Sequence, residues 1–172
     1  MTVLETSRLR LVPCSVELAI ALVAEARSLA AGLLAAQLPD GWPDAELAEL
    51  LPGYAQAVAA DPELLGWGPW IVVEGERVAG SAGFLGQPAG GTVELGYGIA
   101  PEARCRGVAT EAAQALLAWA LADPRVREVV AEVEPENAAS HRVLKKIGMR
   151  RAGTVNEHER WALTLPEQGL TS

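Results

Sequence analysis

The sequence has few of the residues that mark disulfide-rich, metal-binding or membrane proteins. Its two cysteines, Cys14 and Cys105, lie far apart and without the spacing of metal ligands. This pattern argues against a disulfide framework and against a zinc site. No apolar stretch is free of charge for the length of a membrane span, and the first residues lack the basic-then-apolar pattern of a signal peptide. We therefore expect a cytoplasmic protein that does not enter a membrane.

Positive charge is also scarce. The net charge is −8 and the isoelectric point is about 4.8, so nucleic acid is not an expected partner, whereas a cationic amine is. Nucleotide signatures are missing too, because Gly96-x-Gly98 has no third glycine at dinucleotide spacing and no loop ends in Gly-Lys-Ser/Thr. His141 and His158 have no companion ligands in the sequence, so we expect no metal.

The composition that remains is that of a globular protein. Of the 172 residues, 50% are hydrophobic and 21% are charged, which fits one folded domain with a sizeable core. No linker or internal repeat divides the chain. We expect a single domain over residues 1–172, with residues 166–172 as a tail.

The central stretch of the chain runs from residue 93 to residue 122. It begins within a predicted strand over residues 92–99 and, after Pro101, passes through a loop into a helix whose apolar positions recur at helical spacing. A further strand is predicted over residues 126–133. Strand, helix and strand in this order form a βαβ unit, which requires the two strands to be parallel.

The remaining patterns predict strands before and after this unit, and helices early and late in the chain. A helix over residues 44–60 is expected to bend or break at Pro52 and Gly53, and Asn137 is expected to cap a short helix. The further predicted strands cover residues 8–13, 71–74, 78–85, 150–153 and 160–165.

The loop before the central helix has the features of an anion site. A helix N-terminus offers backbone N–H groups without intrahelical partners and the positive end of the helix dipole, which suits a pyrophosphate. Gly107 lets the backbone approach an anion closely, and the small Ala109 leaves the amides uncovered. Arg104 and Arg106 add donors and positive charge. The spacing of these residues alone fits equally well an ordinary helix N-terminus with two solvent-exposed arginines.

Two motifs resemble those of the GCN5-related N-acetyltransferases (GNAT). Arg104-x-x-Gly107-x-Ala109 resembles the loop with which this family binds the pyrophosphate of acetyl-coenzyme A (acetyl-CoA). Residues 136–149 resemble the family's second motif, in the expected order and spacing. Residues 4–11 resemble the first strand of the branch that includes the ribosomal-protein alanine N-acetyltransferases.

The resemblance implies an α/β fold with one mixed, mostly antiparallel sheet, flanking helices and a parallel strand pair that splays apart. Splayed strands leave backbone groups unpaired, which is costly unless a ligand pairs with them. The pantetheine arm of acetyl-CoA has amides that would do so, and its pyrophosphate would lie on the loop amides. The cofactor-binding residues implied in this way are Ile99, Arg104, Cys105, Arg106, Gly107, Val108, Ala109, Thr110 and Asn137.

Acetyl transfer to an amine requires a base, an oxyanion donor and an acid for the departing thiolate. The resemblance implies Glu94 as the base, with Glu157 and Glu159 as reserve candidates. Glu94 fits a solvent-facing strand carboxylate equally well. The backbone N–H of Ile99 is the expected oxyanion donor.

The general acid that protonates the thiolate is assigned through two comparisons with the family. Many family members use a tyrosine that falls at Leu144 here, and a leucine has no proton to give. The resembling branch places a serine near the sulfur, so Ser140 is the expected acid. In the alternative interpretation, Ser140 is only an early residue of the helix that Asn137 caps.

We therefore expect an acetyl-CoA-dependent N-acetyltransferase that acts by direct attack within a ternary complex, because no activated nucleophile is visible. The acceptor would be a primary amine, either a protein N-terminus or a small molecule, and the enzyme a monomer or homodimer. The main alternative is a catalytically inactive acyl-CoA-binding sensor or interaction module. Transfer of a longer acyl group and a cofactor-free interaction domain are further alternatives.

Overall fold

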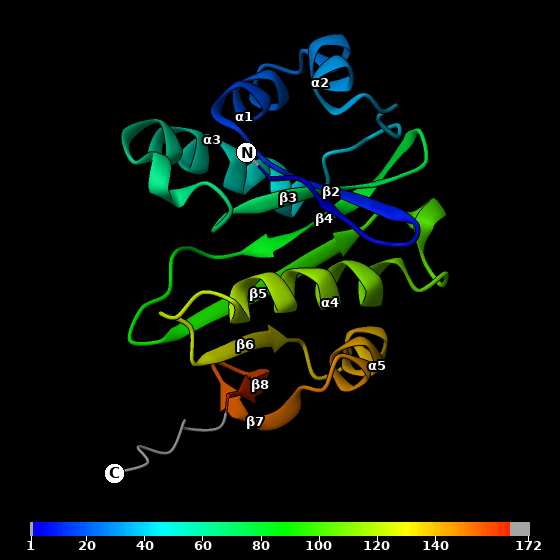
Figure 1. Ribbon diagram of the computed structural model, residues 1–172. Coiled ribbons are helices and arrows are strands. Elements are labelled where there is room, and N and C mark those ends of the chain that lie inside the picture. Colours follow the sequence, from blue (N-terminus) through cyan, green and yellow to red (C-terminus); the bar gives the residue numbers. More distant parts are fainter. Residues whose placement is uncertain (1, 166–172) are drawn as a thin grey trace.

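Eight strands of the described residues form one sheet in the order β1-β2-β3-β4-β5-β6-β8-β7 (Figure 1). The computed structural model describes residues 2–165, so the predicted tail at 166–172 lies outside the described residues. The strands are β1 (Leu4–Glu5), β2 (Leu9–Pro13), β3 (Pro69–Glu74), β4 (Arg77–Phe84), β5 (Thr92–Ile99), β6 (Glu128–Val133), β7 (Arg150–Val155) and β8 (His158–Thr164).

The strand pairing is antiparallel except between β5 and β6, which are parallel and joined by the central helix. This confirms the predicted α/β fold with a mixed, mostly antiparallel sheet. The helices are α1 (Val16–Val23), α2 (Arg27–Leu34), α3 (Ala45–Ala60), α4 (Val108–Leu121) and α5 (Ala138–Lys146). Two short 3-10 turns, η1 (Pro62–Leu64) and η2 (Pro101–Ala103), precede β3 and the loop before α4.

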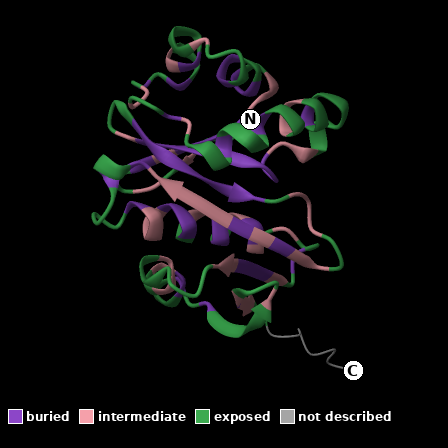
Figure 2. Cartoon of the chain, turned by 180° about the vertical axis from the view of Figure 1, so that it is seen from behind, coloured by how far each residue is buried: buried purple, intermediate pink, exposed green. Residues whose placement is uncertain are grey.

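Helices cover both faces of the sheet, and the alternation of side chains along β3 separates the two layers. Trp70 and Val72 pack in the cluster that includes α4 and the end of α5. Ile71 and Val73 pack in the cluster formed with α1, α2 and α3. The strands β3 and β4 are accordingly buried and β5 is mostly half-buried, while the outer helix surfaces are exposed (Figure 2).

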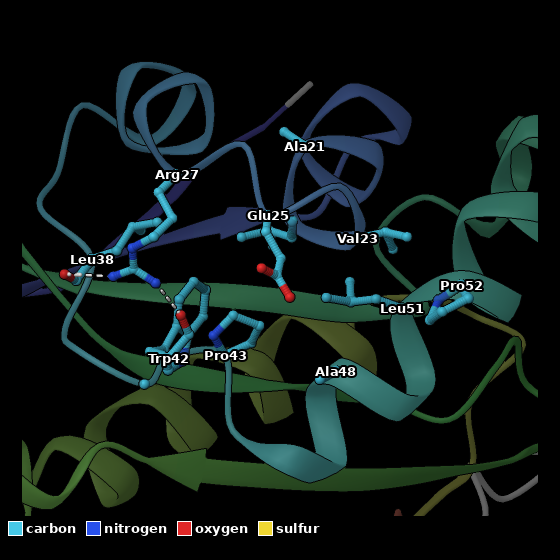
Figure 3. Close-up of a pocket in the computed structure, with 12 residues that line it drawn as sticks. Ala21, Val23, Glu25, Arg27, Leu38, Trp42, Pro43, Ala48, Leu51 and Pro52 are labelled. Carbon is cyan, nitrogen blue, oxygen red and sulfur yellow. Dashed lines mark hydrogen bonds between the residues drawn. The ribbon is translucent and has the colours of Figure 1, made fainter.

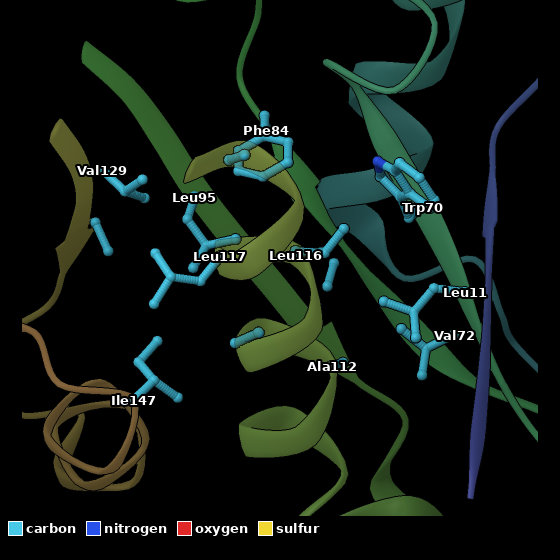
Figure 4. Packing of buried hydrophobic residues seen from close by; sticks show 14 of the residues in the cluster. Leu11, Trp70, Val72, Phe84, Leu95, Ala112, Leu116, Leu117, Val129 and Ile147 are labelled. Atoms are coloured by element: carbon cyan, nitrogen blue, oxygen red, sulfur yellow. The ribbon is translucent and has the colours of Figure 1, made fainter. Parts of the chain in front are cut away.

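The helix α4 lies against the sheet along an apolar stripe (Figure 4). Val108, Ala112, Leu116 and Ala120, at the predicted helical spacing, are each at most 1% exposed. The small alanines let the helix axis approach the strands, and Leu116 fills the space between them. This packing fixes the start of α4, and thus the loop before it, relative to β5.

One helix prediction needs correction. Pro52 and Gly53 do not break α3, which is one helix from Ala45 to Ala60. The helix buries Leu47, Leu51 and Val58 against the second cluster, and this tertiary packing outweighs the roughly 3 kcal/mol cost of an internal proline.

The parallel pair β5–β6 separates after three positions. Thr92, Val93 and Glu94 pair with Glu128, Val129 and Val130. Beyond this point β5 continues to Ile99 along β4, and β6 continues to Val133 along β8, with no further pairing between them in the described chain. The splayed strand pair expected from the resemblance is therefore present.

Candidate active site

A cleft of about 750 Å³ lies beside the unpaired end of β5. Its walls come from the start of α3 (residues 44–46), the end of β5 (97–99), the loop with the start of α4 (103–110) and α5 with its cap (137–146). The predicted site residues that line it are Ile99, Arg104, Cys105, Gly107, Val108, Ala109, Thr110, Asn137 and Ser140. Arg106 and Glu94 are not among the lining residues.

The loop before α4 leaves the backbone amides of residues 105–110 without partners in the described part of the protein. Cys105 and Gly107 both have positive φ angles, +59° and +78°, and Gly107 is the N-cap of α4 without a side-chain cap. Within residues 2–165, no protein group accepts a hydrogen bond from the backbone amides of residues 105–110. A row of unpartnered amides at the positive end of a 14-residue helix is a site for an anion.

The two arginines of the loop have different partners. Arg104 lines the cleft, and its Nε donates to the carbonyl of Ile99 at 2.9 Å. The guanidinium of Arg106 turns away and pairs with Glu74 on β3 at 2.7 Å. Arg104 therefore ties the loop to the end of β5, whereas Arg106 ties it to the end of β3.

The loop is also held by the segment between β1 and β2. Glu111, in the first turn of α4, accepts hydrogen bonds from the hydroxyl of Thr6 at 2.6 Å and from Nε of Arg8 at 2.8 Å. The Ser7 hydroxyl and the Arg8 amide also donate to it. These bonds, the Thr6 hydroxyl foremost, lower the pKa of Glu111 to about 2. Arg8 in addition donates to the carbonyl of Arg106 at 3.0 Å.

The end of β5 directs backbone groups into the gap between the strands. The amide of Ala100 donates to the carbonyl of Ala79 on β4 at 2.8 Å. Because successive residues of a strand direct their N–H and C=O groups to opposite sides, the backbone groups of Tyr97 and Ile99 are directed away from β4, into the gap. The amide of Ile99 is thus available as an oxyanion donor.

The start of α5 forms the opposite wall. Asn137 caps the helix as predicted, its side-chain oxygen accepting from the Ser140 amide at 3.0 Å. Ser140 is half-buried, and its carbonyl accepts a hydrogen bond from the Tyr97 hydroxyl at 3.4 Å. Leu144, at the position of the family's tyrosine, is fully buried.

Glu94 is the last residue of β5 that pairs with β6, and it lies on the face of the sheet opposite α4. Its neighbours Val93 and Leu95 pack with α4, so alternation places Glu94 on the other face. Burial raises the pKa of Glu94, the nearby Glu132 raises it further, and Arg160 lowers it. A half-buried carboxylate with a raised pKa where two strands separate is suited to take up a proton.

The reserve carboxylates have other surroundings. Glu159 lies 3.2 Å from Arg151 and 3.4 Å from Nε2 of His141. Glu157 is exposed in the turn between β7 and β8. Neither residue lines the cleft.

Several cleft residues were not singled out from the sequence. Arg142 and Lys146, one turn apart on α5, bring positive charge to the cleft, and Asp44 and Glu46 bring negative charge from α3. The spacing i, i+4 could have placed the two cations on one helix face. Tyr97 gave no signal, because a tyrosine in a strand is most simply a packing residue.

A second cavity of about 440 Å³ lies among α1, α2 and α3 (Figure 3). Arg27 donates to the carbonyls of Trp42 and Pro39, each at 2.7 Å, and to that of Leu38 at 3.2 Å. Its guanidinium is therefore occupied by the loop that borders the cavity. The walls are mostly apolar, and the predicted motifs lie elsewhere.

Residues 2–165 contain neither a metal-binding cluster nor a membrane-spanning helix. No group of three or more histidine, cysteine, aspartate or glutamate side chains is placed to hold a metal ion. No helix of this part of the chain is both long and apolar enough to cross a bilayer.

Comparison with known proteins gives the same fold and family. The family model for an acetyltransferase (GNAT) domain matches residues 8–150. The uncharacterized N-acetyltransferase YjdG of Bacillus subtilis (strain 168) is 30% identical over 164 residues, which cover 94% of this chain and 97% of YjdG.

Solved structures of acetyltransferases share the fold. RimL, a ribosomal L7/L12 alpha-N-protein acetyltransferase in complex with coenzyme A, superposes with a TM-score of 0.68 at 16% identity, covering 95% of this chain and 98% of that one. The structure of AAC(6')-Ib in complex with ribostamycin and coenzyme A superposes with a TM-score of 0.63 at 19% identity. The superposition covers 92% of this chain and 94% of that one. From the family match over most of its length, the chain is an acetyltransferase that belongs to the GNAT family.

Proposed function

We propose that the chain transfers the acetyl group of acetyl-CoA to a primary amine by direct attack within a ternary complex. The observation that carries this proposal is the row of unpartnered amides at residues 105–110, opening into a cleft that ends at the splayed strands. The pyrophosphate of acetyl-CoA would accept hydrogen bonds from the loop amides, and its pantetheine amides would pair with the free backbone groups of the splayed strands. The residues present therefore fit this cosubstrate.

The charges of the cleft support the placement of the nucleotide. Arg104, Arg142 and Lys146 line it on the side of α4 and α5, where they would contact the phosphates. The protein as a whole is acidic, with a net charge of −8, so these cations concentrate positive potential where an anionic cosubstrate would lie.

The other end of the cleft suits a cationic acceptor. Asp44 and Glu46 line it at the start of α3. A Cβ built on Gly98 would lie 3.0 Å from the Oδ2 of Asp44, so this carboxylate reaches over β5. A primary amine, protonated at neutral pH, is attracted to such a site. A protein N-terminus and a small-molecule amine both meet this description.

The residues around the gap supply the groups that the reaction needs. Glu94 takes up the proton of the acceptor ammonium, directly or through water, and the Ile99 amide donates to the oxyanion. The departing thiolate needs a proton donor, and the family resemblance implies a hydroxyl group beside the start of α5, with Ser140 as the candidate that the resemblance names. A protein that bound acetyl-CoA without transferring it would be the sensor alternative.

The test is acetyl-CoA-dependent thiol release with a panel of small amines and N-terminal peptides, together with calorimetric binding of acetyl-CoA. We expect binding and turnover with one acceptor class, and an acetylated acceptor by mass spectrometry. Binding without turnover on the whole panel would favour the sensor. Absence of acetyl-CoA binding would contradict both the proposed function and the sensor.

A further inference from the structure

Tyr97 places a phenol in the cleft, three residues beyond Glu94, the last position of β5 that pairs with β6. It lines the cleft from β5, two residues before Ile99. Its hydroxyl reaches the start of α5, 3.4 Å from the Ser140 carbonyl. The phenol is thus adjacent both to the serine and to the strand end that carries the proposed oxyanion donor.

The chemistry of the neighbouring groups favours the phenol as a proton donor. Leu144 is fully buried and apolar. The hydroxyl of Ser140 is an alkyl alcohol, which is a much weaker acid than a phenol. A phenol with an ordinary pKa of about 10 can protonate a thiolate whose conjugate acid has a pKa of roughly 8.5, and the proton transfer is then unfavourable by only about 1.5 pKa units.

We propose, on the basis of the proposed function, that Tyr97 is the catalytic residue that protonates the departing thiolate of coenzyme A. The acceptor nitrogen forms a bond to the acetyl carbon, and the bond from that carbon to sulfur breaks with its electron pair left on sulfur. The Tyr97 hydroxyl gives its proton to this sulfur. Glu94 first takes one proton from the acceptor ammonium and releases it to solvent, which leaves the neutral amine that attacks. After the attack the nitrogen loses its second proton to Glu94, and exchange of this proton through solvent restores both the Glu94 carboxylate and the Tyr97 phenol.

The surroundings of Tyr97 fit this role. Burial raises the pKa of Tyr97 above its ordinary value of 10.0, and the hydrogen bond with Ser140 lowers it, so the phenol carries its proton at neutral pH. The nine-residue helix α5 begins at Ala138, and its positive end favours a transient negative charge on oxygen or sulfur beside it. Ser140 then acts as the group that positions the phenol.

The kinetic test compares Tyr97→Phe with Tyr54→Phe. Tyr54 is the other tyrosine of the chain, and its hydroxyl donates to the carbonyl of Cys14, outside the cleft. We expect Tyr97→Phe to lower kcat about a hundredfold without changing the affinity for acetyl-CoA, and Tyr54→Phe to leave kcat unchanged. Loss of kcat in Ser140→Ala with none in Tyr97→Phe would return the role to Ser140 and overturn the proposal.

A second measurement needs no acceptor. The thiol of bound coenzyme A, labelled with 13C at the carbon next to sulfur, is titrated by NMR in the wild type and in both variants. A phenol that hydrogen-bonds the thiolate lowers the thiol pKa, so Tyr97→Phe should raise it by about 1 to 2 units. An unchanged thiol pKa would contradict the proposal, and failure of the wild type to bind coenzyme A would instead contradict the proposed function.

Discussion

At the scale of a single residue, the neighbours of Glu94 shift its pKa in opposite directions. Burial and Glu132 raise its pKa, while Arg160, which lies 3.5 Å from Glu132, lowers it. The ionised form of Glu94 therefore opposes folding. This cost appears as the pH rises from the ordinary pKa of 4.5 toward the raised value, and it is complete above that value.

Glu94→Gln should lower kcat by a factor of about 10² to 10⁴, the usual contribution of a general base. It should also remove the acid limb that Glu94 contributes to the pH–rate profile. Because glutamine carries no charge, the variant should unfold at the same or a higher denaturant concentration at neutral pH. The matched control is Glu76→Gln in the exposed turn between β3 and β4. Loss of activity in Glu159→Gln but not in Glu94→Gln would move the base to β8.

Cys105 adopts a backbone conformation that favours glycine, with φ at +59°. This conformation costs a residue with a Cβ about 1 to 2 kcal/mol, and glycine loses about 0.5 to 1 kcal/mol through its freer unfolded chain. Cys105→Gly should therefore raise the free energy of unfolding by up to about 1 kcal/mol, measured by chemical denaturation. Cys105→Ser keeps the backbone strain, so its free energy of unfolding should not rise above that of the wild type. A less stable glycine variant would show that the cysteine side chain holds the loop.

At the scale of elements, the segment between β1 and β2 holds the start of α4 in place through hydrogen bonds. Four donor groups of Thr6, Ser7 and Arg8 donate to the carboxylate of Glu111. Because this environment lowers the pKa to about 2 from 4.5, the stabilisation is complete above about pH 4.5 and is lost as the pH falls toward 2.

Glu111→Gln should lower the free energy of unfolding at neutral pH by about 1 to 3 kcal/mol, because bonds to a charged acceptor become bonds to a neutral one. The loss relative to wild type should shrink as the pH falls below 4.5. Denaturation curves at several pH values measure both effects. Glu17→Gln, in the exposed first turn of α1, is the control. Equal stability of Glu111→Gln and wild type at neutral pH would show that the segment does not depend on this charge.

The elements were predictable from the sequence where local patterns decide them. Alternation and turn residues gave β5 over Thr92–Ile99 as predicted, and the cap at Asn137 was correct. The continuity of α3 through Pro52 was not predictable, because burial against another helix outweighs a local preference. The splay itself came from the family resemblance, since no pattern within β5 indicates that its partner strand turns away.

Side-chain partners in the site were less predictable than the elements. The sequence grouped Arg104 with Arg106, but only Arg104 lines the cleft. The partner of Arg106, Glu74, lies on β3, and their contact depends on how the loop is packed over the sheet. Tyr97 became a candidate only when α5 was seen to bring Ser140 to its hydroxyl.

At the scale of the whole molecule, the sheet consists of two parts, β1–β5 and β6–β8, that share three paired positions. A ligand that pairs with the free backbone of β5 and with the loop amides would bridge the gap between them. We therefore expect acetyl-CoA to protect two segments from hydrogen exchange, residues 95–99 and 105–110.

Mass spectrometry of deuterium uptake, with and without acetyl-CoA, checks this expectation. The paired residues Thr92–Glu94 serve as an internal control, because their amides lie within the sheet. Protection around Trp42 and Leu51, at the cavity among α1, α2 and α3, would place the ligand elsewhere.

The most direct measurement is calorimetric titration of acetyl-CoA into the wild type, Gly107→Glu and Gly107→Gln. Gly107 has φ at +78°, so both variants strain the loop equally and differ only in charge. If the amides at residues 105–110 hold the pyrophosphate, the glutamate variant should bind at least about a hundredfold more weakly than the glutamine variant, because like charges in contact cost several kcal/mol. Equal affinity of the two variants would contradict the placement of acetyl-CoA on this loop.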